Sequence, residues 1–264
     1  MTIVETIQNL ISTFLNPQYL VVALPDILKY GLWNTLFIAI IATAIGIVIG
    51  LVLAALGVSN SRVLRWLAGI YTDIFRGLPA ALTILAIGGG FAPIVNPITH
   101  GNPYPLGIMA LALIGGAYIG EIFRAGILAI DKGQLEACRA LGMSYNAAMW
   151  KVVIPQGIRS VLPSLVNQFI AIVKDSSLVY FLGFATAQRE LFRVGEDASV
   201  TYANLSPLFT AGVFYLIITV PLTHLVNVID RRLRHGRAVS DATTLDEDLV
   251  AEVPLPARAA VGRE

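Results

Sequence analysis

A chain of 264 residues with 56% hydrophobic residues, 13% charged residues and a mean hydropathy of +0.74 is more apolar than an ordinary soluble protein, in which about 25% of residues are charged. This composition predicts an integral membrane protein. A net charge of +1 gives no reason to expect nucleic acid, and the single cysteine, Cys138, excludes an internal disulfide and cannot form a metal site alone.

The N-terminal residues 1–30 alternate apolar and polar groups, which is typical of a segment that lies at the outer membrane interface. A membrane-spanning helix needs about 20 mostly apolar residues, and five later stretches meet that condition. They predict an all-α membrane domain over residues 31–235. The predicted spans cover about residues 33–56, 67–92, 106–130, 161–184 and 207–229.

Two of these spans carry features that interrupt a regular helix. The second contains Gly77 and Pro79 in its early part, which is therefore expected to bend or to lie at the interface. The fourth contains the adjacent charges Lys174 and Asp175, which point to different sides of a helix. A break in regularity is expected at that point too.

A polar segment, residues 131–160, separates the third and fourth spans and is too polar to cross a bilayer. Helix-forming residues precede a breaker at Gly142, and Ser144 is typical of a helix N-cap. The helix after Ser144 is expected to extend to Val153 and to stop at Pro155. The segment is therefore predicted to form two short helices joined by a tight turn, a shape suited to docking on a partner.

Lysine and arginine concentrate on one side of the predicted membrane domain. Cytoplasmic loops are enriched in these residues, so that side is predicted to be cytoplasmic. The N-terminus is then outside, and the C-terminus and the two-helix loop are inside. The basic side holds Arg62, Arg65, Lys132, Arg139, Lys151, Arg159, Arg231, Arg232, Arg234 and Arg237, and the other side holds Lys29, Arg189 and Arg193.

After the last span, residues 236–264 are rich in acidic residues, alanine and proline and show no periodicity, so they are predicted to form a disordered cytoplasmic tail. No internal repeat stands out in the chain, in contrast to many secondary transporters. Any twofold symmetry must therefore come from a second subunit.

The polar loop resembles the EAA loop of bacterial ABC importer permeases, in which Glu-Ala-Ala, a later glycine and an Ile-Pro element recur. The segments YTDIFRGLP, AYIGEIFRAG and KDSSL are similar to the polar amino acid subfamily, so the resemblance covers about residues 30–230. Cys138 departs from the pattern by replacing an alanine with another small residue. The matching loop residues are Gly133, Gln134, Glu136, Ala137, Gly142, Pro155 and Gln156.

This resemblance implies a type I ABC importer permease fold, with the loop as the site that couples to the ATPase. It also implies a bacterial inner-membrane location, a second permease subunit, two cytoplasmic ATPase subunits and an extracytoplasmic amino-acid-binding protein. The sequence lacks a phosphate-binding loop, a His-Glu-x-x-His motif and a Gly-x-Ser-x-Gly motif. The chain is therefore expected to be a transport subunit without cofactor, with ATP and magnesium bound by the partner ATPase.

Polar residues within spans are costly in a bilayer, so they are the candidates for a translocation path or gate. Asp73–Arg76 and Glu121–Arg124 both have the spacing of a local ion pair, which is the structural alternative. Polar residues on one face of the fourth span line a conduit or, alternatively, join helices. The candidates are Arg76, Glu121, Ser164, Asn167, Gln168, Lys174, Asp175 and Ser176.

The cargo is the least determined feature of the sequence. The family often places glutamate where this chain has Gln168, and loss of that carboxylate favours glutamine-like or glutamate-like cargo over cationic amino acids. An autonomous channel or secondary carrier that uses Glu121, Lys174 and Asp175 as relays is the alternative function. An intramembrane enzyme is disfavoured, because Ser176 and its neighbour have no histidine nearby in the sequence.

Overall fold

The computed structural model describes residues 2–183 and 188–251, with side chains as far as residue 233. Five helical segments in this part of the chain are long and apolar enough to cross a membrane, which confirms the predicted all-α fold with five spans. These segments are Leu24–Gly57, Ala80–Thr99, Tyr104–Leu128, Leu162–Leu182 and Ser206–Leu233.

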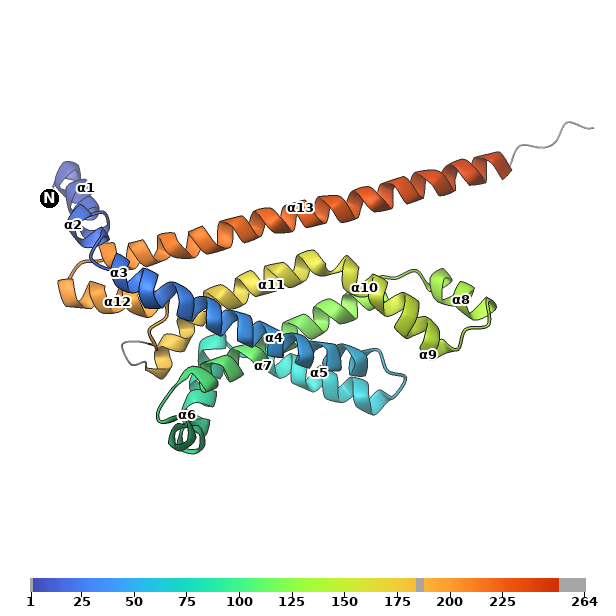
Figure 1. Cartoon of the computed structure of the whole chain (residues 1–264), viewed down its shortest axis with the longest axis horizontal. Helices are drawn as coiled ribbons and strands as arrows, with labels where there is room; N and C mark the ends of the chain where they lie inside the picture. Colours follow the sequence, from blue (N-terminus) through green and yellow to red (C-terminus); the bar gives the residue numbers. More distant parts are fainter. Residues whose placement is uncertain (1, 184–187, 252–264) are drawn as a thin grey trace, which may run out of the picture.

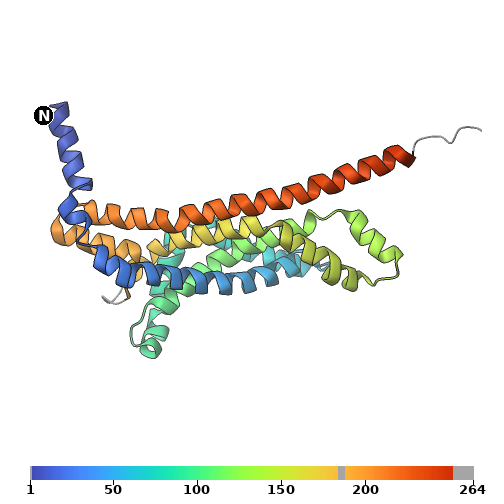
Figure 2. The same ribbon diagram turned by 45° about the horizontal axis from the view of Figure 1, so that its top comes forward.

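The long helices α4 (Leu32–Gly57), α7 (Tyr104–Leu128), α11 (Leu162–Asp175) and α13 (Ser206–Ala251) run along the length of the molecule (Figures 1 and 2). We call one end of this bundle the loop end, because α8 (Lys132–Ala140) and α9 (Tyr145–Ala148) project from it. The other end, which carries α1 (Ile3–Phe14) and α12 (Leu191–Tyr202), is the N-terminal end.

Helices α4 and α7 form the most extensive contact between two helices of the described chain. Each carries two glycines four residues apart, Gly46 and Gly50 on α4 and Gly116 and Gly120 on α7. A Cβ at Gly50 would lie 2.6 Å from a side-chain atom of Ile119, so a larger residue would push the helices apart. Small residues allow this close packing, which supplies much of the attraction between helices in a bilayer.

The predicted second span is divided into two helices, α5 (Arg62–Gly77) and α6 (Ala80–Thr99). Leu78 adopts an extended conformation, with φ −83° and ψ 141°, because the residue before a proline is pushed out of the helical region. The expected bend is confirmed, but the predicted bounds 67–92 are wrong. The spanning helix starts at Ala80, and α5 is a separate amphipathic helix.

The fourth span also breaks where the sequence predicted. Helix α11 ends at Asp175 and continues as the 3₁₀-helix η3 (Ser176–Leu182), whose tighter turn moves the following side chains to a new face. The last residue of the predicted span, 184, lies outside the described residues.

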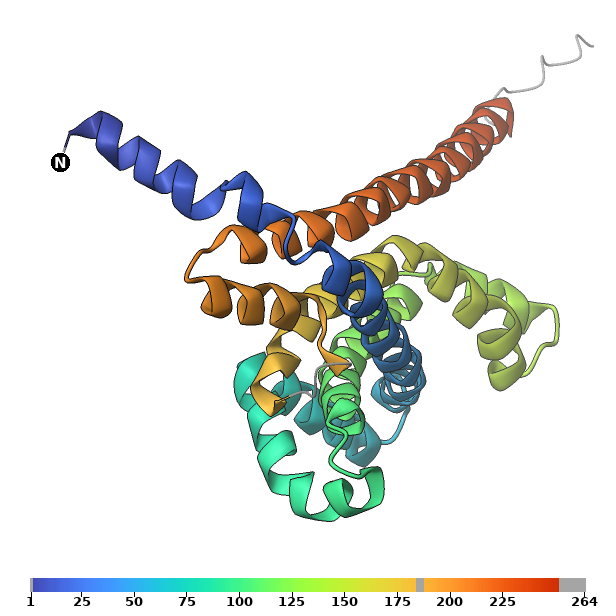
Figure 3. The same cartoon turned by 60° about the vertical axis from the view of Figure 1, so that its left-hand side comes forward.

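The N-terminal segment is helical for most of its length, through α1, α2 (Pro17–Leu20), α3 (Leu24–Asp26) and the π-helix η1 (Ile27–Gly31). Residues from Leu24 onward are continuous with α4, so the first spanning helix begins earlier than the predicted residue 33. Helix α1 extends away from the bundle and crosses the direction of the long helices (Figure 3). Its residues are almost all exposed.

The C-terminal end of the chain differs from its prediction. Helix α13 continues to Ala251, whereas the sequence predicted a disordered tail from residue 236. Residues 237–251 contain neither glycine nor proline and include several alanines and leucines, which favour a helix. The rest of the predicted tail, residues 252–264, lies outside the described residues.

Candidate functional site: a docking loop and two polar clusters

The predicted two-helix loop is present at the loop end of the bundle. The Asp131 carboxylate accepts a hydrogen bond from the Gly133 amide at 2.8 Å and caps α8. Gly142 then adopts φ +82°, a left-handed conformation that favours glycine, and turns the chain. The Ser144 hydroxyl accepts from the Ala147 amide at 3.2 Å, which confirms the predicted N-cap of the next helix.

The predicted stop at Pro155 is wrong. Helix α9 continues through the π-helix η2 (Met149–Val153) into α10 (Ile154–Ser160), with Pro155 in the first turn of α10. A first-turn position needs no backbone donor, and the wider π-turn before it accommodates the proline ring. Residues 145–160 therefore form one continuous helical arm.

Most of the predicted docking residues are open on the surface of this loop. Gly133, Gln134, Glu136, Ala137, Gly142 and Gln156 are exposed, whereas Pro155 is half-buried. Leu141, between the two helices, has 84% of its surface exposed. The turn of the loop therefore presents an apolar side chain beside the predicted docking residues.

A cavity of about 330 Å³ separates α8 from the helical arm and the spans. Leu135 and Glu136 line it from α8, Tyr145 and Met149 line it from the arm, and Ile127 lines it from α7. Helix α8 is therefore loosely packed, and the arm provides its mechanical support.

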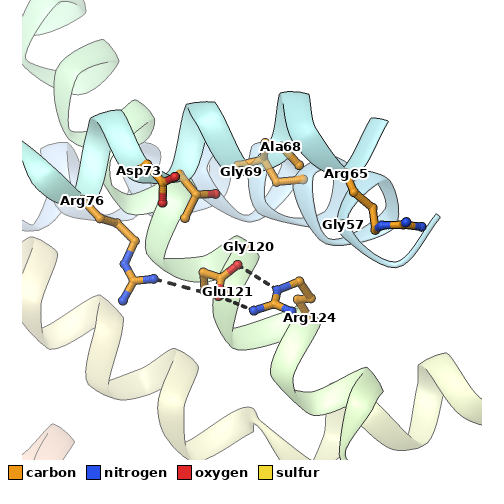
Figure 4. Close-up of a pocket in the computed structure, with 11 residues that line it drawn as sticks. Gly57, Arg65, Ala68, Gly69, Asp73, Arg76, Gly120, Glu121 and Arg124 are labelled. Carbon is orange, nitrogen blue, oxygen red and sulfur yellow. Dashed lines mark hydrogen bonds and ion pairs between the residues drawn. The ribbon is translucent and has the colours of Figure 1, made fainter. Parts of the chain in front are cut away.

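A second cavity, of about 320 Å³, lies nearby between α4, α5 and α7 (Figure 4). The polar face of α5 provides Arg65, Thr72, Asp73 and Arg76 to its lining. Helix α5 is amphipathic, and its opposite face exposes Val63, Trp66, Leu67, Ile70 and Ile74.

Glu121 on α7 is the centre of the charges in this cavity. Its carboxylate accepts two hydrogen bonds from the Arg124 guanidinium, at 2.8 and 2.9 Å, and lies 3.9 Å from the Arg76 guanidinium (Figure 4). The predicted Glu121–Arg124 pair is confirmed. Among the ion pairs of the described residues Asp73–Arg76 is absent, because Arg76 turns toward Glu121 and over the ring of Tyr118.

The remaining candidates lie on α11, except Ser176, which begins η3, and none of them lines this cavity. Ser164, Asn167 and Lys174 are exposed, and Gln168 and Asp175 are half-buried, on a face that repeats every three to four residues. Ser176 differs from them, because it is buried and its hydroxyl donates to the Val173 carbonyl at 2.8 Å. The candidates thus form an inner ion cluster and a separate polar stripe.

Sequence reasoning missed a buried carboxylate at the N-terminal end. Glu190 is 0% exposed and accepts hydrogen bonds from the amides of Phe192 and Arg193, at 2.6 and 2.7 Å, and from the Tyr215 hydroxyl at 3.1 Å. Burial raises the pKa of Glu190 to about 7, although the amide donors oppose that shift. The only indication of this role in the sequence is the position of Glu190 directly before the amphipathic helix α12, which it caps.

The segment around Glu190 is held by several helices at once. The Leu191 amide donates to the Thr35 hydroxyl on α4, and the Tyr104 hydroxyl on α7 donates to the Gln188 carbonyl, both at 3.0 Å. Arg189 pairs with Asp26 at 2.7 Å and with Asp197 at 3.5 Å. Glu190 therefore lies at the centre of a fixed junction rather than in a binding site.

Within residues 2–183 and 188–233, whose side chains the structure describes, no group of three His, Cys, Asp or Glu side chains could hold a metal ion. A five-span helical bundle with a two-helix loop at one end and polar residues between its helices defines a multi-pass membrane protein.

Comparison with known families gives the same result. Residues 46–235 match the family described as binding-protein-dependent transport system inner membrane component. The chain belongs to this family, so it is a multi-pass inner-membrane protein and a transport subunit rather than an enzyme.

Curated relatives include the arginine transport system permease protein ArtQ of Bacillus subtilis, which is 35% identical over 80% of this chain and 94% of its own length. The glutamate transport system permease protein GluD of Corynebacterium glutamicum is 32% identical over 85% of this chain and 78% of its own length. A putative glutamine transport system permease protein GlnP of Rickettsia typhi is 36% identical over 82% of this chain and 98% of its own length.

Solved structures support the fold. The crystal structure of an amino acid ABC transporter with histidines matches with a TM-score of 0.66 and 33% identity, over 79% of this chain and 94% of that chain. The inward-facing MetNI methionine ABC transporter matches with a TM-score of 0.65 over 76% of this chain and 94% of that chain, and at 21% identity this match supports the fold alone. The predicted type I importer permease fold is confirmed.

Proposed function

We propose that this chain is the permease subunit of an ATP-driven importer of polar amino acids. The observation that carries the proposal is the exposed, rigid loop of residues 131–160 on a five-span bundle that has no nucleotide motif of its own. Energy then enters from a docked ATPase. The named cargoes of the relatives, which are arginine, glutamate and glutamine, support an amino acid as the substrate.

The assembly that fits this role contains a second permease, homologous or identical, two ATPase subunits that bind ATP and magnesium, and an extracytoplasmic binding protein. The polar stripe of α11 is exposed in the single chain and would line a path only against a second subunit. The lysine and arginine bias supports an N-terminus outside and a loop end in the cytoplasm.

Transport then follows alternating access. ATP binding closes the ATPase pair and displaces the docked loops, and the bundle opens to the outside to receive cargo from the binding protein. Hydrolysis resets the assembly. Each ligand shifts this equilibrium only by its difference in affinity for the two states.

Within this scheme the cargo is glutamine-like or glutamate-like, because Gln168 offers the α11 stripe an amide rather than a carboxylate. The functional test is uptake by proteoliposomes that contain the permease, its ATPase and its binding protein, with glutamine, glutamate and arginine as cargoes. Uptake should require ATP. Uptake that persists with an inactivated ATPase would favour the autonomous carrier instead.

Cargo selectivity is tested separately with Gln168→Glu, with Gln8→Glu as the matched control, because Gln8 is exposed on α1 and lies outside the α11 stripe. The new carboxylate should raise the uptake of arginine relative to glutamate. If the relative uptake of arginine, glutamine and glutamate is unchanged in Gln168→Glu, Gln168 does not determine the selectivity for cargo.

A further inference from the structure

The docking loop joins the membrane helices through an unusually close backbone contact. Gly157 on α10 lies directly against Gly126 on α7, and both residues are buried. A Cβ on Gly157 would lie 2.9 Å from the Gly126 carbonyl oxygen and from the Ile127 Cα, and a Cβ on Gly126 would lie 2.6 Å from the Gly157 carbonyl oxygen. We call this contact the glycine joint.

The obstructing atoms of the glycine joint belong mostly to the backbone. A side chain can rotate away from an added methyl group, but helical backbone cannot without a shift of the whole helix. Even alanine on either side would therefore separate α7 from α10 locally. Neither glycine has a positive φ, so what glycine provides here is the absence of a side chain, which allows the two backbones to approach closely.

An apolar cluster surrounds the glycine joint and keeps it closed. Phe123 on α7 is buried in a cluster that includes Ile158 on α10 and Val161 just after it. The Ser160 hydroxyl donates to the Gly157 carbonyl at 2.8 Å. The Ser160 bond lies within α10, so the apolar cluster is what holds α10 and α7 as one packed unit.

The glycine joint is the base of the helical arm that supports the docking surface. The arm runs from Tyr145 to Ser160, and its far end meets α8 across the turn at Gly142. The cavity beneath α8 leaves that helix without tight support from the spans. A force applied at α8 therefore reaches the bundle by two routes, through residues 129–131, which join α8 to the end of α7, and through the arm and its contact with α7.

The same stretch of α7 carries the ion cluster. Glu121 and Arg124 precede Gly126 within two turns, and Glu121 contacts Arg76 on α5, just before the break at Gly77–Pro79. A displacement of α10 would carry this part of α7 with it. Because α5 packs against α7, the end of α5 would then move relative to α6, with Glu121–Arg76 as the charged contact between the two helices.

We propose that the glycine joint is the rigid coupling contact through which movement of the docking loop is passed to α7 and then, through Glu121, to the break between α5 and α6. Gly126 and Gly157 are positioning residues in this assignment. The inference rests on the proposed function, since it requires a docked ATPase to move the loop.

The first test is Gly157→Ala in the complete transporter, reconstituted with its ATPase and binding protein. We expect the ATPase to co-purify and to hydrolyse ATP, while uptake per ATP hydrolysed falls about 2- to 30-fold, the range over which coupling mutations act. Gly90→Ala is the matched control, because a Cβ at Gly90 meets nothing within 4 Å. A wild-type ratio of uptake to hydrolysis in Gly157→Ala would overturn the proposal.

The second test leaves both glycines intact, so it holds even if Gly157→Ala fails to assemble. Spin labels are placed on α7 and α10 through Leu128→Cys and Arg159→Cys, both exposed positions, in a Cys138→Ala background free of other cysteines. The distance between the labels, measured by electron–electron double resonance, should be the same in the nucleotide-free and ATP-trapped transporter. A distance that changes between these states would refute a rigid contact.

Failure of the proposed function would look different from failure of this inference. If the wild-type assembly showed no ATP-dependent uptake of any amino acid, the proposed function itself would fall. If the wild type transports and Gly157→Ala transports equally well per ATP, only the glycine joint is rejected.

Discussion

The two charged clusters of this permease differ in burial and in what they can do. Near the loop end, Glu121 is shared between Arg124 and Arg76 in an open cavity, with Arg76 43% exposed. Near the N-terminal end, Glu190 is fully buried and its carboxylate caps a helix. A hydrated ion pair exchanges partners at little cost, whereas a buried carboxylate loses much when any partner leaves. The first cluster suits movement and the second suits anchorage.

The largest expected effect tests the anchorage. Glu190→Ala removes the helix cap and leaves the amides of Phe192 and Arg193 without their acceptor. We expect the free energy of unfolding to fall by about 4 kcal/mol, measured by denaturation in detergent micelles. Glu196→Ala, at a half-buried position of the same helix, is the control and should cost much less. An equal fall in the free energy of unfolding in both variants would show that Glu190 is not a special anchor of this helix.

The second test uses the proton affinity of the same carboxyl. Burial raises the pKa of Glu190 from 4.5 to about 7, so the folded state binds the proton more tightly than the unfolded state. The extra stability that comes from this tighter proton binding is full below pH 4.5 and is lost as the pH rises to about 7, by about 3 kcal/mol in total. Unfolding measured across this range should show that slope in the wild type. Glu190→Gln should lack it, and an unchanged slope in the variant would assign it elsewhere.

The third test concerns the inner cluster, where function should respond more than stability. Glu121→Gln should change the free energy of unfolding by less than about 1 kcal/mol, because its partners are partly hydrated. Uptake should fall about tenfold, since the link between α7 and α5 is weakened. The combination with Arg76→Gln should add little to the single loss. Additive losses in uptake would show that the two residues act independently.

The smallest expected effect belongs to the partly exposed ion pair beside Glu190. Asp26→Asn breaks the contact with Arg189, which also pairs with Asp197. The free energy of unfolding should fall by less than about 1 kcal/mol, and the loss should shrink further in high salt. Unfolding of the variant at low and high ionic strength measures this. A loss comparable to that of Glu190→Ala would mean that the whole N-terminal cluster, rather than one carboxylate, provides the anchorage.

Local chemistry explains which elements could be predicted. Gly142 predicts a turn, because glycine readily adopts the left-handed conformation found there. Ser144 predicts a helix cap, because its hydroxyl can accept a hydrogen bond from the amide three residues later. Pro79 predicts the break in the second span, because a proline favours an extended conformation in the residue before it, here Leu78. The predicted helix end at Pro155 is wrong, because a proline can end or begin a helix according to the turn before it, which is here the π-helix η2.

The site was only partly predictable, because its members come from distant parts of the chain. The sequence shows Arg76 and Glu121 as two separate charged residues, and their contact depends on how α5 lies against α7. Gly126 and Gly157 carry no polar group that would mark them in a sequence, although their backbones come into direct contact. In the sequence, Glu190 is only an acidic residue near Arg189 and Arg193, and nothing there indicates that it is buried.

By itself the sequence determined the membrane environment, the number of spans and the two-helix loop, since hydropathy, turn residues and caps act over a few neighbouring residues. Tertiary structure alone decided which charges meet, which carboxylate is buried and where the loop is joined to the spans. Those properties depend on the approach of helices that are far apart in the chain, and the small residues that permit such an approach are indistinguishable in sequence from those that face open space.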